Sequence, residues 1–260
     1  MTLTQPSAAT GPADAPMPPV DLNHVTVTGD ISVDDIAARV HRDGIVILPE
    51  FITGPLLEQL NKEFDQIMAA PDNCAFQVDR KTGLVNVRTS IEIMQRAGMA
   101  NTAALFSNAM MAEIAYAYYG TRDAKVNHQL FINLNEHSPT PHMEPPFALH
   151  FDKREVFKFF IYLTDTTAEN GAMRVAPGTV EANRALRQNA MASGVPLQQI
   201  NNVIDEQAVP SLPIEGPAGT MFIFTTDVAH GAGAVAPGQS RRIMRGHCHS
   251  QAMLQAMGQA

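Results

Sequence analysis

The sequence predicts an α+β fold in which N-terminal helices are followed by strands that close into a jelly roll. Two observations predict this class. Apolar residues recur at helical spacing before Gly120, whereas short apolar strands separated by Gly and Pro turns follow it. The chain has 260 residues, of which 45% are hydrophobic, so it can bury one sizeable core.

We expect a single domain over residues 31–250, because no internal repeat or linker interrupts it. Residues 1–30 and 251–260 are expected to be tails. The first twenty residues are rich in Pro, Ala and Ser, which predicts disorder. They have neither a basic start nor an apolar core of the kind found in secretory signals, so we do not interpret them as one.

Three helices are expected in the first half of the chain. Residues 32–41 place apolar side chains at helical spacing, and Gly44 ends that helix before a buried strand at 45–48. A second helix runs from Pro55 to a stop near residue 71, and a third covers residues 101–119. These helices supply the α part of the fold.

The β part is expected in the second half, apart from loosely alternating residues 72–90 with a turn at 81–83. The expected strands are 126–135, 156–164, 172–176, 220–225 and 241–249. Residues 180–209 form the longest polar insertion, with a helix at 181–191. An insertion of this length near a site is typical of a lid.

Composition excludes several classes of protein. The formal net charge of −8 gives no basic footprint for nucleic acid, and no apolar run approaches the ~20 residues that span a membrane. Cys74 and Cys248 are the only cysteines and lie far apart, as expected in a reducing compartment. We therefore expect a cytoplasmic enzyme with a small-molecule substrate; the sequence leaves its oligomeric state open.

A candidate metal site lies at His150 and Asp152. Side chains two apart in an extended strand project to the same side, so this imidazole and carboxylate can act together. His230 follows eighty residues later, and two histidines with one carboxylate form the facial triad of non-heme Fe(II) oxygenases. By itself the His-x-Asp pair is weak evidence, since a core histidine and a turn aspartate give the same letters.

Further motifs raise its specificity. Residues 163–179 read Leu-Thr-Asp, then Glu-Asn-Gly-Ala, then Pro-Gly-Thr; a Gly-led strand enters His230; and Arg241 follows eleven residues later. Together with the helix that runs into Asp43-Gly44-Ile45-Val46-Ile47-Leu48-Pro49, these elements resemble the phytanoyl-CoA dioxygenase family of Fe(II)/2-oxoglutarate oxygenases over residues 33–250. The resemblance implies a double-stranded β-helix, a cupin-like jelly roll, braced by N-terminal helices.

The resemblance also implies roles for individual residues. His150, Asp152 and His230 would bind Fe(II), and Arg241 would pair with 2-oxoglutarate, which is consumed with O2 to give succinate and CO2. An arginine suits this role because its planar fork binds a carboxylate bidentately. Arg242 is its rival. Related halogenases lack the carboxylate, so Asp152 favours hydroxylation of an unactivated C–H bond, or another oxidative outcome such as desaturation or ring formation, over halogenation.

Other candidates line the expected cavity. Phe160 matches the family's aromatic residue near the cosubstrate, with a plain core position as the alternative. Alternation places Asn127 and Gln129 on one face, with His128 on the other, and both could bind the cosubstrate or simply fill ladder positions. Candidate substrate residues are Arg88, Tyr162 and Arg245. By alternation Arg245 and His247 share the face of Arg241, so His247 is a further candidate for the lining of the same cavity.

Two other functions stay open from the sequence. A cupin-like metal enzyme could use the same jelly roll without 2-oxoglutarate and would not need Arg241. A jelly-roll binding or sensor protein would need no chemistry at all.

The run His247-Cys248-His249 does not favour a zinc site, because neighbouring strand residues point apart and no second ligand pair accompanies it. An amino-acid-like or specialised metabolite is the expected substrate.

Overall fold

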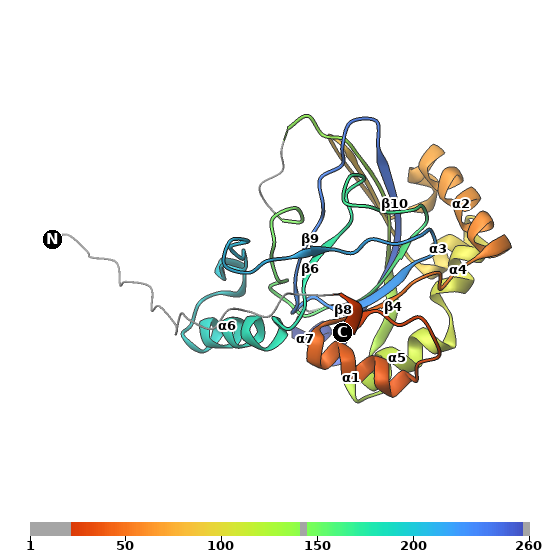
Figure 1. Ribbon diagram of the computed structural model, residues 1–260. Coiled ribbons are helices and arrows are strands. Elements are labelled where there is room, and N and C mark those ends of the chain that lie inside the picture. The colour runs from red at the N-terminus through yellow and green to blue at the C-terminus, as the bar shows by residue number, and fades with distance from the viewer. Residues whose placement is uncertain (1–21, 141–144, 257–260) are drawn as a thin grey trace.

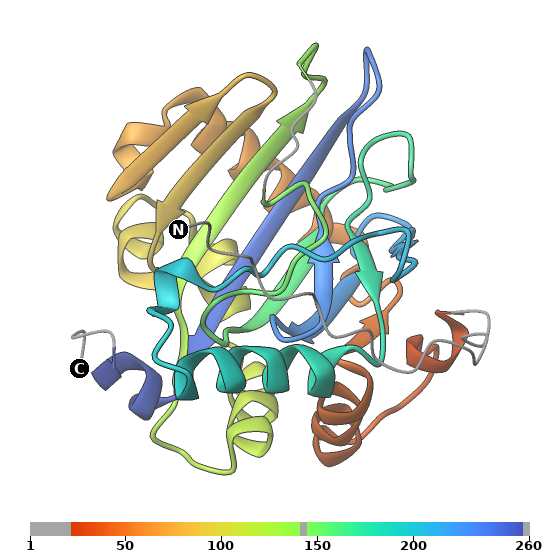
Figure 2. The ribbon, with the colours of Figure 1, turned by 90° about the vertical axis from the view of Figure 1, so that its left-hand side faces the viewer.

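The structure, a computed structural model, describes residues 22–140 and 145–256. Residues 1–21 of the N-terminal tail, which is expected to be disordered over residues 1–30, lie outside this range, as do residues 257–260. Two antiparallel sheets face each other, and the first five α-helices cover the outer side of the larger sheet (Figures 1 and 2). This is the jelly roll that the sequence predicts.

The large sheet has seven strands in the order β1-β8-β5-β10-β4-β3-β2. Their bounds are β1 Ile45–Leu48, β2 Gln77–Lys81, β3 Leu84–Thr89, β4 Lys125–Glu136, β5 Phe157–Tyr162, β8 Met221–Thr225 and β10 Ser240–His249. The small sheet has the order β7-β6-β9, with β6 Arg174–Ala176, β7 Leu212–Pro213 and β9 Ala229–Gly231. Each expected strand is present, and the expected turn at 81–83 joins β2 to β3.

Helices precede and flank these strands. Their bounds are α1 Val33–Asp43, α2 Gly54–Ala69, α3 Ile91–Arg96, α4 Ala100–Phe106, α5 Ala109–Tyr119, α6 Val180–Ala192 and α7 Gln251–Ala256, with short 3-10 turns at Asn23–Val25, Pro71–Cys74 and Leu197–Gln199. Ser32 caps α1 by accepting from the amide of Asp35, and Gly44 ends it in the left-handed region. None of the helices within the described ranges is both long and apolar enough to cross a bilayer.

Three expectations about elements were wrong. The expected helix 101–119 is two helices, because the Asn108 side chain accepts from the amide of Met110 and starts α5 anew. The C-terminal tail forms α7 over its first six residues. On the N-terminal side, Val25 is fully buried and the amide of Val27 donates to the carbonyl of Ile47, so this part of the expected tail packs against β1.

Alternation along the large sheet separates two apolar cores. Phe157, Phe159 and Ile161 of β5 point outward and pack with the helices. Phe160 and Tyr162 point inward, toward the small sheet. The inner face therefore receives every second residue of β4, β5 and β10, and the functional side chains lie there.

Candidate metal centre and cosubstrate pocket

The two histidines of the expected triad are joined through their backbones. His150 lies in the segment between β4 and β5, and His230 is the central residue of β9. The His150 amide donates to the His230 carbonyl at 2.9 Å, and the reverse bond is 2.8 Å. This bridge sets the two rings 4.5 Å apart, centroid to centroid.

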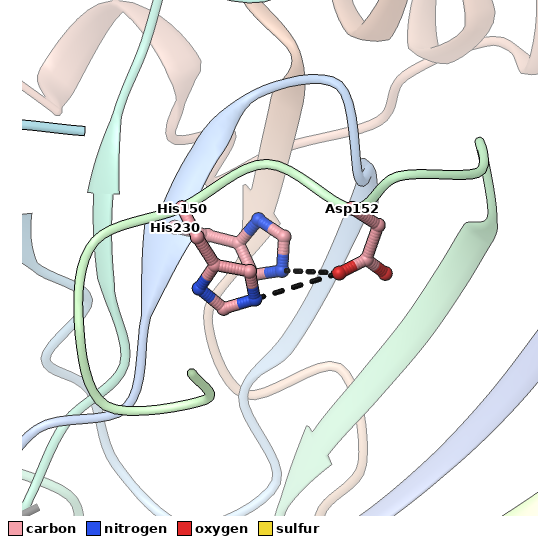
Figure 3. Close-up of side chains that lie close together, drawn as sticks. All are labelled: His150, Asp152 and His230. Carbon is pink, nitrogen blue, oxygen red and sulfur yellow. Dashed lines mark ion pairs between the residues drawn. The ribbon is translucent and has the colours of Figure 1, made fainter. Parts of the chain in front are cut away.

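The ligand atoms converge on one point (Figure 3). The Nε2 atoms of His150 and His230 lie 3.4 and 3.8 Å from Oδ1 of Asp152, and one ligand atom from each residue lies within 4.8 Å of the others. Asp152 is fixed by its amide, which donates to the carbonyl of Thr226. The expected grouping is therefore present.

Both imidazoles are prepared for metal binding. Nδ1 of His150 lies 2.8 Å from the carbonyl of Ala148, and Nδ1 of His230 lies 2.9 Å from that of Val228. A carbonyl only accepts, so each Nδ1 carries the proton and each Nε2 keeps its lone pair. Burial and the neighbouring His150 lower the pKa of His230 to about 3, which keeps the ring neutral.

Lys158 holds the carboxylate of the triad. Its ammonium lies 2.9 Å from Oδ2 of Asp152, so Oδ1 is left facing the two histidines. Although burial opposes it, the Lys158 charge and the two neighbouring histidines hold the pKa of Asp152 well below its usual range. Lys158 is not among the residues predicted from the sequence, although the alternation that places Phe160 and Tyr162 inward also places Lys158 inward.

The triad fits an iron ion. Two neutral imidazole nitrogens and one carboxylate oxygen occupy one side, as in the facial triad of non-heme Fe(II) enzymes. A cavity of about 350 Å³, lined by His150, Asp152 and Val156 among others, adjoins the site. Ligands other than protein atoms can therefore reach the metal position.

A second cavity, of about 590 Å³, is lined by Arg241. Arg241 is 2% exposed, and its Nε and Nη1 have no partner among the described residues. Tyr162 lies beside it; the Tyr162 hydroxyl accepts from the amide of Met173 at 3.0 Å. Arg242 points the other way, with Nη1 2.9 Å from Asp65 and its guanidinium over Phe64. Of the two rivals, only Arg241 offers free donors to this cavity.

Residues 40–243 match the sequence model of the phytanoyl-CoA dioxygenase (PhyH) family. The chain belongs to the phytanoyl-CoA dioxygenase family. Membership makes it a non-heme Fe(II)/2-oxoglutarate-dependent enzyme, and its His-Asp-His triad and the free donors of Arg241 agree with that cofactor pair. No protein of curated function matches the chain.

Solved structures share the fold of this dioxygenase. SnoN, an alpha-ketoglutarate-dependent epimerase of nogalamycin biosynthesis, is 18% identical with a TM-score of 0.60, over 84% of this chain and 82% of its own. The carbocyclase SnoK is 16% identical with a TM-score of 0.62, over 85% and 87%. EctD from S. alaskensis, solved with bound Fe, is 17% identical with a TM-score of 0.59, over 84% and 76%. The double-stranded β-helix is thereby confirmed.

The remaining candidates mostly gather around the second cavity of the dioxygenase. Phe160, Arg88 and Arg245 line it, and Tyr162 backs it through Arg241. Gln129 pairs with His247 in the register of β4 and β10, further along the same face as Arg245. Their contacts with a cosubstrate or substrate stay predictions.

Asn127 is the exception, and its expected position was wrong. A register shift between β4 and β10 falls at this residue, whose φ of 45° turns its side chain outward. Its side-chain nitrogen Nδ2 donates to the carbonyl of Phe106 on the helix side at 2.9 Å. Gly246 permits this, since a Cβ there would lie 2.1 Å from the Asn127 side-chain oxygen. His128, expected outside, instead stacks edge-on with His249 at 4.9 Å.

The insertion at 180–209 has two parts. Its helix α6 is fixed to the metal-bearing segment, because Arg187 and Arg184 both pair with the buried Asp227, three residues before His230. Residues 202–206 run along 149–151, where the Phe151 amide donates to the Asn202 carbonyl. The insertion therefore covers the triad, and its action as a lid stays a prediction.

Proposed function

We propose that this dioxygenase hydroxylates an unactivated C–H bond of a small cytoplasmic metabolite, amino-acid-like or specialised, and releases succinate and CO2. One observation carries the proposal: three metal-ligating atoms converge, and a buried arginine has free donors in a cavity whose lining includes Ala232, two residues after His230. A buried guanidinium without an anion is unfavourable, so a carboxylate ligand is expected there.

Each residue then has a task. His150, Asp152 and His230 would hold Fe(II) on one side, and Lys158 would keep Asp152 bound through a single oxygen. Arg241 would bind the distal carboxylate of 2-oxoglutarate through its planar fork. When bound, iron and 2-oxoglutarate would activate O2 for the oxidation of the substrate. The protein orients the reactants and excludes water around them.

Hydroxylation is preferred to halogenation because Asp152 fills the ligand position that halogenases leave open for chloride. The solved relatives catalyse varied reactions: SnoN is an epimerase, SnoK is a carbocyclase, and EctD was solved with 2-oxoglutarate and 5-hydroxyectoine. Those reactions belong to those proteins, and they support a small-molecule substrate for this one.

The test is succinate release by Fe(II)-reconstituted protein supplied with 2-oxoglutarate and O2. Asp152→Ala removes a metal ligand and Arg241→Ala removes the cosubstrate anchor, so each should reduce turnover at least about 100-fold. Arg242→Ala is the matched control and should retain turnover, because its side chain lies on the helix side.

Other outcomes identify the alternatives. Full activity in both Asp152→Ala and Arg241→Ala contradicts the proposal. Metal-dependent oxygen consumption that needs Asp152 but not Arg241 or 2-oxoglutarate indicates the cupin-like enzyme. Failure of the wild type to take up Fe(II) indicates a binding protein.

A further inference from the structure

The cavity that Arg241 lines contains two further guanidinium groups, those of Arg88 and Arg245. Arg88 is compensated: its Nε lies 3.4 Å from a carboxylate oxygen of Asp79, and its Nη1 donates to Gln77. Within residues 22–140 and 145–256, no carboxylate lies within ion-pairing distance of Arg241 or Arg245. Two cationic side chains in this cavity thus lack an anion.

A single molecule of 2-oxoglutarate can neutralise the charge of only one of these two arginines. It has two carboxylates, one of which binds the metal together with the 2-oxo group, so one carboxylate is left for an arginine. Arg241 is the better match for this second carboxylate, because Arg241 is buried and contacts Tyr162. The charge of Arg245, a half-buried side chain, then stays unpaired in the complex with cosubstrate, and an unpaired charge held partly out of solvent is unfavourable.

Arg245 is held in a defined place. Its guanidinium lies 4.5 Å from the ring centroid of Phe131 and 5.3 Å from that of Phe160. Stacking on two rings fixes the plane of the group and leaves its N–H edge for a ligand. Its Nε is removed from solvent and has no acceptor among the described residues. Burial, with repulsion from Arg88 and Arg241, lowers the pKa of Arg245 to about 10, a shift that a bound anion would oppose.

The register places Arg245 between the cosubstrate anchor and the metal. On β10 it pairs with Phe160, and the next inward residue, His247, pairs with Lys158, whose ammonium holds Asp152. Arg241 lies four residues away in the opposite direction. An anion on Arg245 would therefore sit near the metal position, where a substrate must bind.

We propose that Arg245 binds a carboxylate of the substrate, which makes the substrate a small carboxylic acid with an apolar body. Phe160, beside the guanidinium, and Met173 and Ile243 line the cavity with apolar side chains, next to polar ones such as Asn133 and Asn135. The proposal rests on the proposed function, since it assigns the second carboxylate only after Arg241 has taken that of 2-oxoglutarate. It distinguishes Arg245 from Arg88, whose own acidic partner already neutralises it.

Binding calorimetry on the Mn(II)-loaded protein tests this without turnover. The protein is first saturated with 2-oxoglutarate and then titrated with phenylacetate, hexanoate or acetate, each compared with its neutral amide. The wild type should bind at least one acid, and bind it more tightly than the amide. Arg245→Gln should weaken that binding about tenfold or more, since a charge-assisted bidentate contact is lost. Arg242→Gln, at an arginine of the same strand that points to the other face, should leave it unchanged.

Titration of 2-oxoglutarate into the same variants separates the two proposals. Normal 2-oxoglutarate affinity in Arg245→Gln, with loss in Arg241→Gln, is expected and also shows that the Arg245 variant is folded. Failure of the wild type to bind 2-oxoglutarate contradicts the proposed function itself. Loss of 2-oxoglutarate binding in Arg245→Gln overturns only the present inference, because Arg245 would then be the cosubstrate anchor.

A second variant and readout guard against a folding defect. Arg245→Lys keeps the charge but loses the planar fork, so its affinity for the acid should lie between those of wild type and Arg245→Gln. In metal-free protein, the acid that binds should raise the unfolding temperature of the wild type more than that of Arg245→Gln. No binding of any acid to the wild type, or equal binding of the acid by both proteins, overturns the proposal.

Discussion

Lys158 and Asp152 form an ion pair on the inner face of the large sheet, 2.9 Å from ammonium nitrogen to Oδ2. Lys158 is 6% exposed, and its ammonium also lies 5.7 Å from the ring centroid of Phe224. The pair leaves only Oδ1 of the carboxylate directed at the histidines. A side chain six residues beyond the aspartate thus sets how that aspartate can bind a metal.

Lys158→Met should therefore impair the metal centre while keeping the apolar stem of the side chain. Residues that hold a metal ligand in place contribute about 10- to 100-fold to metal affinity or activity, so we expect succinate release to fall by that factor. Lys153→Met is the control, because Lys153 donates to the carbonyl of Gln198 and pairs with no carboxylate among the residues that the structure describes. Wild-type turnover and Fe(II) affinity in Lys158→Met would show that Asp152 needs no such partner.

Arg187→Met should destabilise the segment that carries His230. Arg187 is buried and pairs with the fully buried carboxylate of Asp227, so its loss leaves that charge partly uncompensated. We expect the free energy of unfolding to fall by about 3–5 kcal/mol in urea titrations. Arg184→Met should cost only about 1 kcal/mol, because Arg184 is more exposed although it contacts the same carboxylate at 3.0 Å. Equal effects of the two substitutions would contradict this explanation.

His249 should make the protein sensitive to acid. Burial and the nearby His128 lower the pKa of His249 to about 4, below the ordinary value of 6.5. Between these values the unfolded chain takes up a proton that the folded protein does not, so stability falls as the pH drops below 6.5. At pH 5 the contribution of this group is about 2 kcal/mol. In His249→Gln the loss of stability between pH 7.5 and pH 5 should be smaller by that amount, whereas His24→Gln, at an exposed site, should keep the wild-type loss.

Gly219→Ala should destabilise the fold more than an ordinary glycine replacement. Gly219 has a φ of +86°, and a Cβ there would lie 1.8 Å from the carbonyl oxygen of Ile52. Gly178 has a similar φ of +82° but open space around it, so Gly178→Ala measures the backbone strain alone, about 1 kcal/mol. We expect Gly219→Ala to cost at least about 3 kcal/mol by thermal or urea unfolding. Similar losses of stability in Gly219→Ala and Gly178→Ala would mean that the backbone at Ile52 shifts to make room for the methyl group.

Spacing along the chain was enough to place His150 and Asp152 together, whereas the role of His230 as the third ligand rested on the family resemblance. His150 and Asp152 lie on one side because alternate residues of extended backbone do, and this holds wherever the segment packs. The inward placement of Phe160 and Tyr162 follows from the same rule. Arg241 was separated from Arg242 only by a resemblance, and the structure gave the physical reason, since Arg242 is already paired with Asp65.

Only the tertiary structure decided where regular spacing fails and which charges meet. The φ of 45° at Asn127 turned its side chain to the helix side and His128 packs against His249, because the register shift interrupts the alternation locally in β4. Lys158 and Asp152 meet across a loop whose path no local pattern specifies. The sequence by itself thus determined which side chains share a face, whereas packing decided which of them have partners, and the unpaired Arg245 was visible only there.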